Sequence, residues 1–286
     1  MKLNTITQTI ATILIASSVA ACSSSSTGGT DPSSVSGTLG GTGGSNAAQG
    51  NNLTSGSEGN SCYGDYVDGV QPRLTNTKLA SKTRALCFAE YSVLHSGLTR
   101  TPLWASEHLT YAELLMDIDR TDNFHAEPSL PADERSELAD YAGSGYDRGH
   151  LAPAGDMPTE QAMRESFSLA NMTPQNPTNN RGLWSSIEGK TRDLAQQRGE
   201  LFVVSGAVFA GATLSTINER VLVPSNYFKA VYDANTGEGG AYWVANDASK
   251  NYKVVSIAEL AQLAGIDPFP SISDHSKTNA MALPQP

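Results

Sequence analysis

The chain has 286 residues, of which 39% are apolar and 17% charged, and its formal net charge at pH 7 is −10. This length is sufficient for one large domain with a hydrophobic core. The acidic balance argues at first against a nucleic-acid partner, because non-specific binding to nucleic acid relies on basic side chains. The charge is uneven, however: residues 62–145 carry 13 acidic and 7 basic side chains, whereas residues 146–198 carry six of each. The balanced charge of residues 146–198 therefore weakens the argument against a nucleic-acid partner.

The first 21 residues are typical of an export signal. Lys2 gives a positive start, a largely apolar stretch follows, and small residues lead to Cys22. The apolar run is too short for a comfortable membrane-spanning helix. The motif VAAC at 19–22 resembles a bacterial lipobox, in which the cysteine carries lipid; an ordinary secretory signal is the alternative. The residue after the cysteine is Ser23 and not Asp, a pattern that resembles lipoproteins sorted to the outer membrane. We expect an exported outer-membrane lipoprotein, on its periplasmic or cell-surface side, anchored at Cys22.

Residues 22–61 are expected to form a flexible linker. After the cysteine, the 39 residues include 10 Gly, 11 Ser and 5 Thr, a composition that buries almost no apolar surface. Beyond the linker, Cys62 and Cys87 can form a disulfide in an oxidising compartment. Two free thiols are the alternative. The disulfide would join the start of the domain to a strand beginning near Cys87.

The folded part shows both strand and helix patterns, which predict an α+β domain with a mixed, largely antiparallel sheet. Apolar and β-branched runs predict strands at 88–96, 102–110, 112–118, 201–209, 219–224, 227–234 and 239–246. Helical spacing predicts helices within 132–141, from Thr159, from Pro177 to about Gln197, and from a capping box at Ser256. The simplest division is one domain over 62–272 followed by a C-terminal tail over 273–286.

The stretch SGYDRGHLAPAGDM contains the first candidate site residues. On a strand, Arg148 and His150 share one face, while Asp147 and Gly149 point away from it. A neighbouring arginine disfavours the imidazolium form, so we expect a neutral histidine near pH 7 that can act as a base. Gly149 would leave room for backbone or phosphate to approach. An Arg-x-His pair alone is more often part of an ordinary surface strand.

The helix after Asn176 adds a second set of polar groups. At about 100° per residue, Asn180, Glu188 and Arg192 lie on a stripe beside the buried one. The buried stripe is predicted to contain Leu183, Ile187 and Leu194. A solvent-exposed i,i+4 ion pair is the alternative for the two charged residues. Together with a neutral histidine, these groups suit phosphodiester hydrolysis with a hard cation that keeps most of its waters.

Two segments resemble a known family. DRGHLAP at 147–153 and NMTPQNPTNNRGLWSSIEGKTRDLA at 171–195 are similar to signatures of the DNA/RNA non-specific endonucleases, the ββα-metal (His-metal finger) nucleases. The resemblance extends over roughly 63–272. It implies a ββα-metal finger site, cleavage of DNA and RNA with little sequence preference, and products with 5′-phosphates. It also implies one divalent cation, Mg²⁺, with Mn²⁺ as an alternative.

The resemblance assigns the central roles to three side chains. His150 matches the general base, Asn180 the direct metal ligand, and Glu188 the carboxylate that orients a metal-bound water. The remaining histidines lack the spacing of a zinc site.

Further residues match supporting positions of the family. Arg148 and Arg192 match phosphate-binding arginines, and Arg120 resembles the upstream arginine of the site. Asn171 is expected to hold the histidine loop through hydrogen bonds. Asp156 is interpreted as structural rather than as a second metal ligand.

The partners implied are single- and double-stranded DNA and RNA, and a membrane through the lipid anchor. A second copy of the chain in a homodimer and a protein inhibitor are further possible partners. Trp184 is expected to be a packing residue, and Lys229 to lie beside the groove or in solvent. One rival hypothesis is a surface nucleic-acid-binding lipoprotein that captures DNA with little or no catalysis. Another is a phosphodiesterase for small substrates, which a closed pocket would favour.

Overall fold

The structure is a computed structural model, and it describes residues 62–286. The predicted signal segment, the lipidation site at Cys22 and the linker over 22–61 lie outside the described residues. Within 62–286, no helix combines the length and the apolar character needed to span a membrane.

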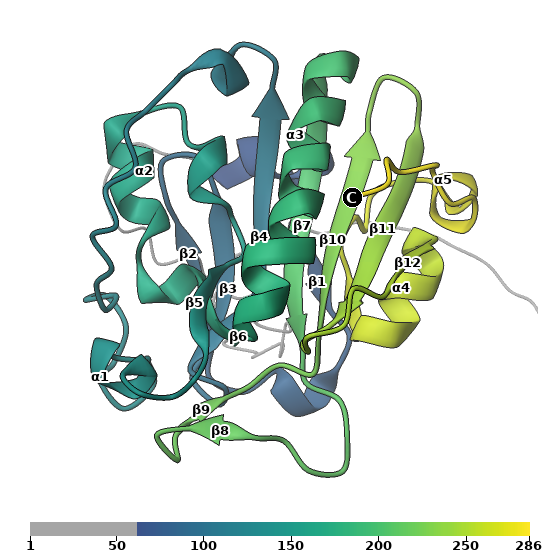
Figure 1. Cartoon of the computed structure of the whole chain (residues 1–286). Helices are drawn as coiled ribbons and strands as arrows, with labels where there is room; N and C mark the ends of the chain where they lie inside the picture. The colour runs from purple at the N-terminus through teal and green to yellow at the C-terminus, as the bar shows by residue number, and fades with distance from the viewer. Residues whose placement is uncertain (1–61) are drawn as a thin grey trace, which may run out of the picture. The chain divides into compact units, whose positions relative to one another are not determined.

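The centre of the domain is a seven-stranded antiparallel sheet with the order β12-β11-β10-β7-β4-β3-β2 (Figure 1). In that order the strands are Tyr252–Val255, Glu238–Ala245, Asn226–Asp233, Glu200–Val208, Thr101–Thr110, Ser92–Ser96 and Thr83–Cys87. The central strands are rich in β-branched and aromatic residues, which suit a pleated surface. The α+β prediction with a largely antiparallel sheet is confirmed.

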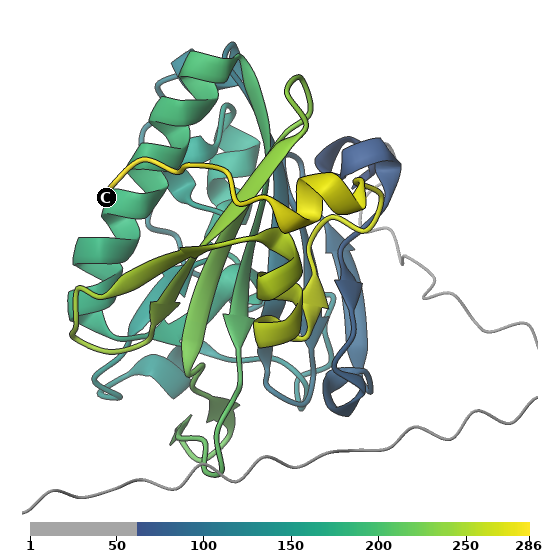
Figure 2. The ribbon, with the colours of Figure 1, turned by 90° about the vertical axis from the view of Figure 1, so that its right-hand side faces the viewer.

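Helices cover both faces of this sheet (Figure 2). On one face, α3 (Ser185–Arg198) packs Leu194 against Val203 of β7. On the other, α4 (Ile257–Ala264) packs Leu260 near Val204, the next residue of the same strand. Successive side chains of a strand point to opposite faces, so both faces of β7 are buried.

The site is built on a smaller unit beside the sheet. Strand β5 (Asp147–His150) pairs antiparallel with β6 (Met172–Gln175). A π-helical turn, Asn179–Trp184, follows β6 and leads directly into α3. Between β5 and β6, α2 (Glu160–Ser166) begins after Thr159, whose side chain accepts a hydrogen bond from the backbone of Ala162. The predicted helix at this position is confirmed.

Shorter elements complete the domain. They are α1 (Leu138–Tyr141), α5 (Asp274–Thr278), the pair β1 (Arg73–Leu74) and β13 (Ile266–Asp267), and the pair β8 (Thr216–Ile217) and β9 (Val221–Leu222). Short 3-10 helices span Cys62–Asp65, Val67–Gly69, Thr77–Leu79, Glu113–Leu115, Ala154–Asp156 and Leu169–Asn171. The segment 273–286 packs on the sheet: Met281 is buried, and the hydroxyl of Tyr242 donates to the carbonyl of Pro284 (2.6 Å).

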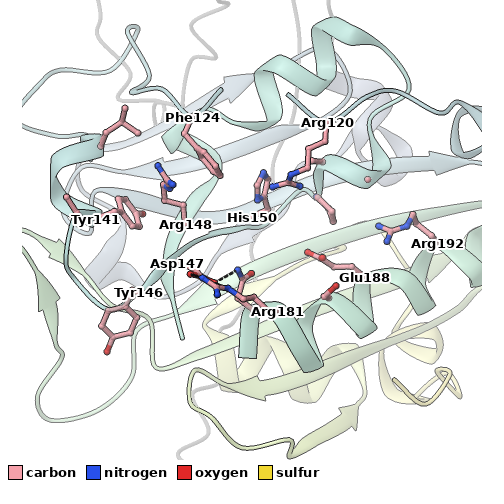
Figure 3. Close-up of a pocket in the computed structure, with 17 residues that line it drawn as sticks. Arg120, Phe124, Tyr141, Tyr146, Asp147, Arg148, His150, Arg181, Glu188 and Arg192 are labelled. Carbon is pink, nitrogen blue, oxygen red and sulfur yellow. Dashed lines mark hydrogen bonds and ion pairs between the residues drawn. The ribbon is translucent and has the colours of Figure 1, made fainter. Parts of the chain in front are cut away.

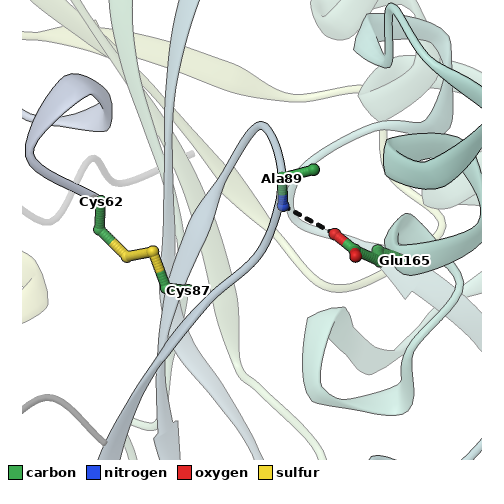
Figure 4. Close-up of a disulfide and its surroundings, with 4 residues drawn as sticks. All are labelled: Cys62, Cys87, Ala89 and Glu165. Carbon is green, nitrogen blue, oxygen red and sulfur yellow. Dashed lines mark hydrogen bonds between the residues drawn. A yellow bond between two sulfur atoms is a disulfide. The ribbon is translucent and has the colours of Figure 1, made fainter. Parts of the chain in front are cut away.

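Three local predictions were wrong. The strand expected at 112–118 is a 3-10 helix at Glu113–Leu115, and its apolar side chains Leu115 and Met116 are exposed rather than paired in a sheet. The strand expected at 219–224 is reduced to Val221–Leu222. Cys62 and Cys87 form the expected disulfide (Figure 4), but Cys87 ends β2 instead of beginning a strand.

Candidate active site

A cleft of about 580 Å³ lies between β5 and the start of α3 (Figure 3). Six side chains that the sequence singled out line it: Arg120, Arg148, His150, Asn180, Glu188 and Arg192. The two motifs, far apart in sequence, therefore meet at one surface.

His150 sits in an aromatic setting on β5. Its ring lies 5.0 Å from that of Phe167, edge to face, and 5.9 Å from that of Phe124. Its Nε2 is buried and has no hydrogen-bond partner. Burial, reinforced by Arg120 and Arg148, lowers the pKa of His150 to about 3. The histidine is therefore neutral near pH 7, as expected. Burial lowers its pKa more than the neighbouring arginines do.

Two arginines stack on the same aromatic residues. The guanidinium of Arg148 lies 3.9 Å from the ring centre of Phe124, and that of Arg120 lies 4.8 Å from that of Phe167. Arg120 also donates to Asp122 (2.7 Å). Stacking on an aromatic face leaves the N–H groups at the guanidinium edge able to bind anionic oxygens.

Asp147 fixes the orientation of Asn180. Its carboxylate accepts a hydrogen bond from the Asn180 amide (2.9 Å) and two from Arg181 (2.8 and 2.6 Å). Burial opposes ionisation, but these donors hold the pKa of Asp147 below its usual value. Because the amide nitrogen is engaged, the Asn180 carbonyl oxygen is the atom left to accept a ligand. The expectation that Asp147 points away from the site is wrong.

The π turn changes which residues of this helix share a face. The backbone N–H of Ser185 donates to the carbonyl of Asn180, five residues earlier. In an unbroken α-helix, Asn180 and Glu188 would be about 80° apart; one extra residue in the turn reduces this to about 20°. The same shift replaces Leu183 in the predicted buried stripe with Trp184, which is fully buried. Trp184 is therefore a packing residue, as expected.

Arg192 is held by the loop that follows β5. Its Nη1 lies 2.6 Å from Oδ1 of Asp156, a side chain that is only 2% exposed, while Arg192 itself is 30% exposed. A Cβ at Gly155 would lie 3.1 Å from the same Nη1. Asp156 thus supports an arginine and does not face the cleft as a metal ligand.

A buried charge cluster lies under this part of α3. Lys229 is 1% exposed, donates to Ser205 (2.6 Å) and lies 5.4 Å from the ring of Trp184. The expectation that it lies beside the groove or in solvent is wrong, because β10 directs it under the helix. Glu107 on β4 is also 1% exposed, and both its carboxylate oxygens lack a hydrogen-bond partner. Burial raises the pKa of Glu188 to about 7, with Lys229 opposing the shift.

Asn171 and Gly149 shape the backbone around the histidine. The Asn171 amide accepts from the backbone N–H of Ala152 (3.0 Å) and donates to the carbonyls of Ala152 (2.8 Å) and Ser166 (3.0 Å). These bonds hold the loop after His150, as the sequence suggested. A Cβ at Gly149 would overlap the side chain of Gln175. Gly149 therefore allows β6 to pack closely and does not make room for phosphate.

Comparison with known proteins assigns the family. The family described as DNA/RNA non-specific endonuclease matches residues 71–275. The chain belongs to this family.

Relatives of this endonuclease-family chain carry related names. It is 31% identical over 213 residues to a human protein named "Nuclease EXOG, mitochondrial", covering 66% of this chain and 58% of the human one. It is also 31% identical over 223 residues to a protein from Nostoc sp. named "Nuclease", covering 72% of this chain and 80% of the relative. The matched segment thus spans under two thirds of the human protein.

The fold has a counterpart among solved structures. The endonuclease-family domain aligns with a chain of "Crystal structure of the EndoG/EndoGI complex: Mechanism of EndoG inhibition" with a TM-score of 0.60 and 24% sequence identity. The alignment covers 68% of this chain and 86% of the other. This likeness supports the ββα-metal nuclease fold.

The side chains of the cleft suit one divalent cation that has few protein ligands. Over 62–286, no group of three or more His, Cys, Asp or Glu side chains is placed to hold a metal. The cleft instead offers the Asn180 carbonyl oxygen and the Glu188 carboxylate. Such oxygen donors suit a hard cation that keeps most of its waters, because Mg²⁺ dehydrates reluctantly and needs few protein ligands.

Proposed function

We propose that the chain is a metal-dependent endonuclease that hydrolyses phosphodiester bonds of DNA and RNA with little sequence preference. The observation that carries this proposal is the meeting of a neutral histidine, an oriented amide, a carboxylate and three arginines in one cleft within the family-matched segment. A protein that only captures nucleic acid has no use for a neutral general base in its cleft.

Each side chain has a chemical task in this proposal. His150 accepts a proton from the attacking water, for which its neutral form is required. The arginines Arg148 and Arg192 bind non-bridging phosphate oxygens, with Arg120 beside them. The water attacks phosphorus and the bond to the 3′-oxygen breaks. The departing 3′-oxygen takes a proton from solvent, so the products carry a 5′-phosphate and a 3′-hydroxyl.

A divalent cation, Mg²⁺ or Mn²⁺, would supply charge neutralisation at the phosphate and at the leaving oxygen. Asn180 would hold it directly and Glu188 through a bound water. Asp147 keeps the Asn180 carbonyl available for this task by binding its amide nitrogen. Ionised Glu188 is the form that orients such a water, and a nearby cation favours that form.

The test uses purified protein with plasmid DNA, single-stranded DNA and RNA, each with Mg²⁺, with Mn²⁺ and with EDTA. We expect cleavage of all three polymers with either cation, 5′-phosphate ends and no cleavage in EDTA. Cleavage that survives EDTA would remove the metal from the proposal. Tight binding without turnover would favour the capture function instead.

We further infer that the domain is exported and anchored by lipid at Cys22. The support is the sequence alone: an export-type segment, the VAAC motif and the Gly/Ser/Thr-rich linker after it. Labelling of growing cells with a radioactive fatty acid tests this inference. Label is expected in the native protein and not in Cys22→Ala, and an unlabelled native protein would contradict it.

A further inference from the structure

The two ends of the cleft differ in chemistry. Figure 3 shows Arg192 and Glu188 on one side of His150, and Tyr141 and Tyr146 on the other. The first end is charged. The second end also has charged side chains, Asp147, Arg148 and Arg181. It differs from the first in its aromatic and aliphatic side chains, which include Leu138 and Ala142.

Tyr146 is the aromatic side chain available to a ligand at the second end. Of the described aromatic residues that line the cleft, Phe124 is covered by Arg148 (3.9 Å) and Tyr141 is buried. Tyr146 packs against the apolar cluster that contains Tyr141 but stays partly exposed. Leu138, which also lines the cleft, is 43% exposed. The arginine-lined cleft therefore also offers apolar side chains to a ligand, and we call Tyr146, Leu138 and Ala142 the apolar ledge.

Tyr146 also lines the same cleft as His150, Asn180 and Glu188. It directly precedes Asp147, whose carboxylate holds the Asn180 amide (2.9 Å). His150, Asn180 and Tyr146 line one cleft, so a nucleic acid held there through its phosphate can also contact this ledge.

We propose that Tyr146, with Leu138 and Ala142, forms a nucleobase subsite that takes the base next to the scissile phosphate. This inference rests on the proposed endonuclease function. A nucleobase has a flat π-face that stacks on an aromatic ring, and stacking tolerates any base. Such a subsite is consistent with low sequence preference. It also favours an unpaired base, because a base inside a duplex is already stacked on its neighbours.

The experiment compares single-stranded oligonucleotides that carry all their bases with abasic oligonucleotides of the same length. The proteins are the native chain, Tyr146→Ala, and the matched control Tyr146→Phe, which keeps the ring and removes only the hydroxyl. The readout is the ratio of kcat/KM on the base-bearing substrate to that on the abasic one. A loss of stacking affects this ratio, whereas a general structural defect lowers both rates together.

We expect Tyr146→Ala to lower the ratio about 5- to 150-fold, the range that corresponds to loss of one base–aromatic stack. Tyr146→Phe keeps the native ratio. An unchanged ratio in Tyr146→Ala, or an equal loss in the Phe variant, overturns the subsite. Leu138→Ser, at an exposed position, is expected to lower the ratio by less, and it serves as a second probe if Tyr146→Ala fails to fold.

Failure of the subsite can be told from failure of the proposed function. If the native chain cleaves neither oligonucleotide with Mg²⁺, the endonuclease proposal fails. The affinities of the same proteins for fluorescent base-bearing and abasic oligonucleotides, measured in EDTA, then still test the subsite. The native chain should prefer the base-bearing strand, and equal affinities in the native chain would contradict the inference.

Discussion

The ion pair between Asp156 and Arg192 connects the loop after the histidine strand to the helix that carries Asn180 and Glu188. Asp156 is 2% exposed and Arg192 is 30% exposed, with 2.6 Å between their charged atoms. Breaking a fully buried pair costs about 3–5 kcal/mol, and an exposed pair contributes at most about 1 kcal/mol. Because Arg192 reaches the cleft and stays partly hydrated, we expect a coupling of about 2–3 kcal/mol between these limits.

A double-mutant cycle isolates this coupling. Asp156→Ala, Arg192→Met and the double variant are unfolded with urea, and the three free energies are compared with that of the native chain. Single substitutions also change the charge around Glu107, Glu188 and Lys229, and the cycle largely cancels those contributions. The corresponding shift in Tm is about 4–12 °C for a domain of this size.

The same cycle, run on nuclease activity, tests whether Asp156 acts through the arginine. Asp156→Ala should lower kcat in the native background and have little further effect in Arg192→Met. A stability coupling below about 0.5 kcal/mol would refute the electrostatic reasoning. Independent, additive losses of activity would show that Asp156 acts by another route.

Three further predictions concern packing, the disulfide and pH. Gly149→Ala should lower the free energy of unfolding in urea by about 1–3 kcal/mol, because the added Cβ meets the side chain of Gln175. Adding Gln175→Ala should recover part of that loss. A Gly149→Ala variant as stable as the native chain would contradict the clash. Replacing Cys62 and Cys87 by Ser opens a loop with a separation of 25 residues and should cost about 3.5 kcal/mol, whereas a change under 1 kcal/mol would argue against this constraint. Burial lowers the pKa of His95 to about 4, so the unfolded chain alone binds this proton between pH 6.5 and 4. As the pH falls through that window, this proton uptake by the unfolded chain lowers the free energy of unfolding by about 3 kcal/mol relative to its value above pH 6.5. His95→Gln should flatten the decline in urea experiments run across these pH values, and an unchanged decline would be evidence against it.

Much of the sheet was predictable because its long strands carry an unambiguous pattern. Strands β7 and β10 are dominated by Val, Phe, Tyr and Ala, and they lie where the sequence placed them. Strands β2 and β12 were missed, since Thr83–Cys87 and Tyr252–Val255 are short and mix charged with apolar residues. The segment 112–118 misled because a run of apolar residues does not distinguish a strand from a short, exposed helix.

The candidate site was predictable where the chemistry lies within local motifs. Asn180, Glu188 and Arg192 line the cleft as expected, although the π turn that aligns the first two has no signature in a fixed 100° periodicity. The direction of the Asp147 side chain was predicted wrongly. Asp147 is the first residue of β5, where strand alternation only weakly fixes the direction of a side chain.

The buried charges could not be predicted from the sequence. Lysine and glutamate are almost never fully buried unless they are paired. Lys229 was therefore expected beside the groove or in solvent, and no sequence pattern indicated the burial of Glu107. Their burial depends on strand order, which sets β10 and β4 on either side of β7. The stacking of Arg148 on Phe124 likewise depends on the path of a loop that has no periodic pattern.

The most direct test of the central claim is the initial rate of supercoiled-plasmid cleavage in Mg²⁺ by the native chain and by His150→Ala. The matched control is His275→Ala, which removes a histidine that does not line the cleft. We predict a loss of at least about 100-fold for His150→Ala, the lower range for a general base, with its Tm close to the native value and with native rates for the control. Cleavage by His150→Ala at the native rate would contradict the assignment of the base, and with it the proposed mechanism.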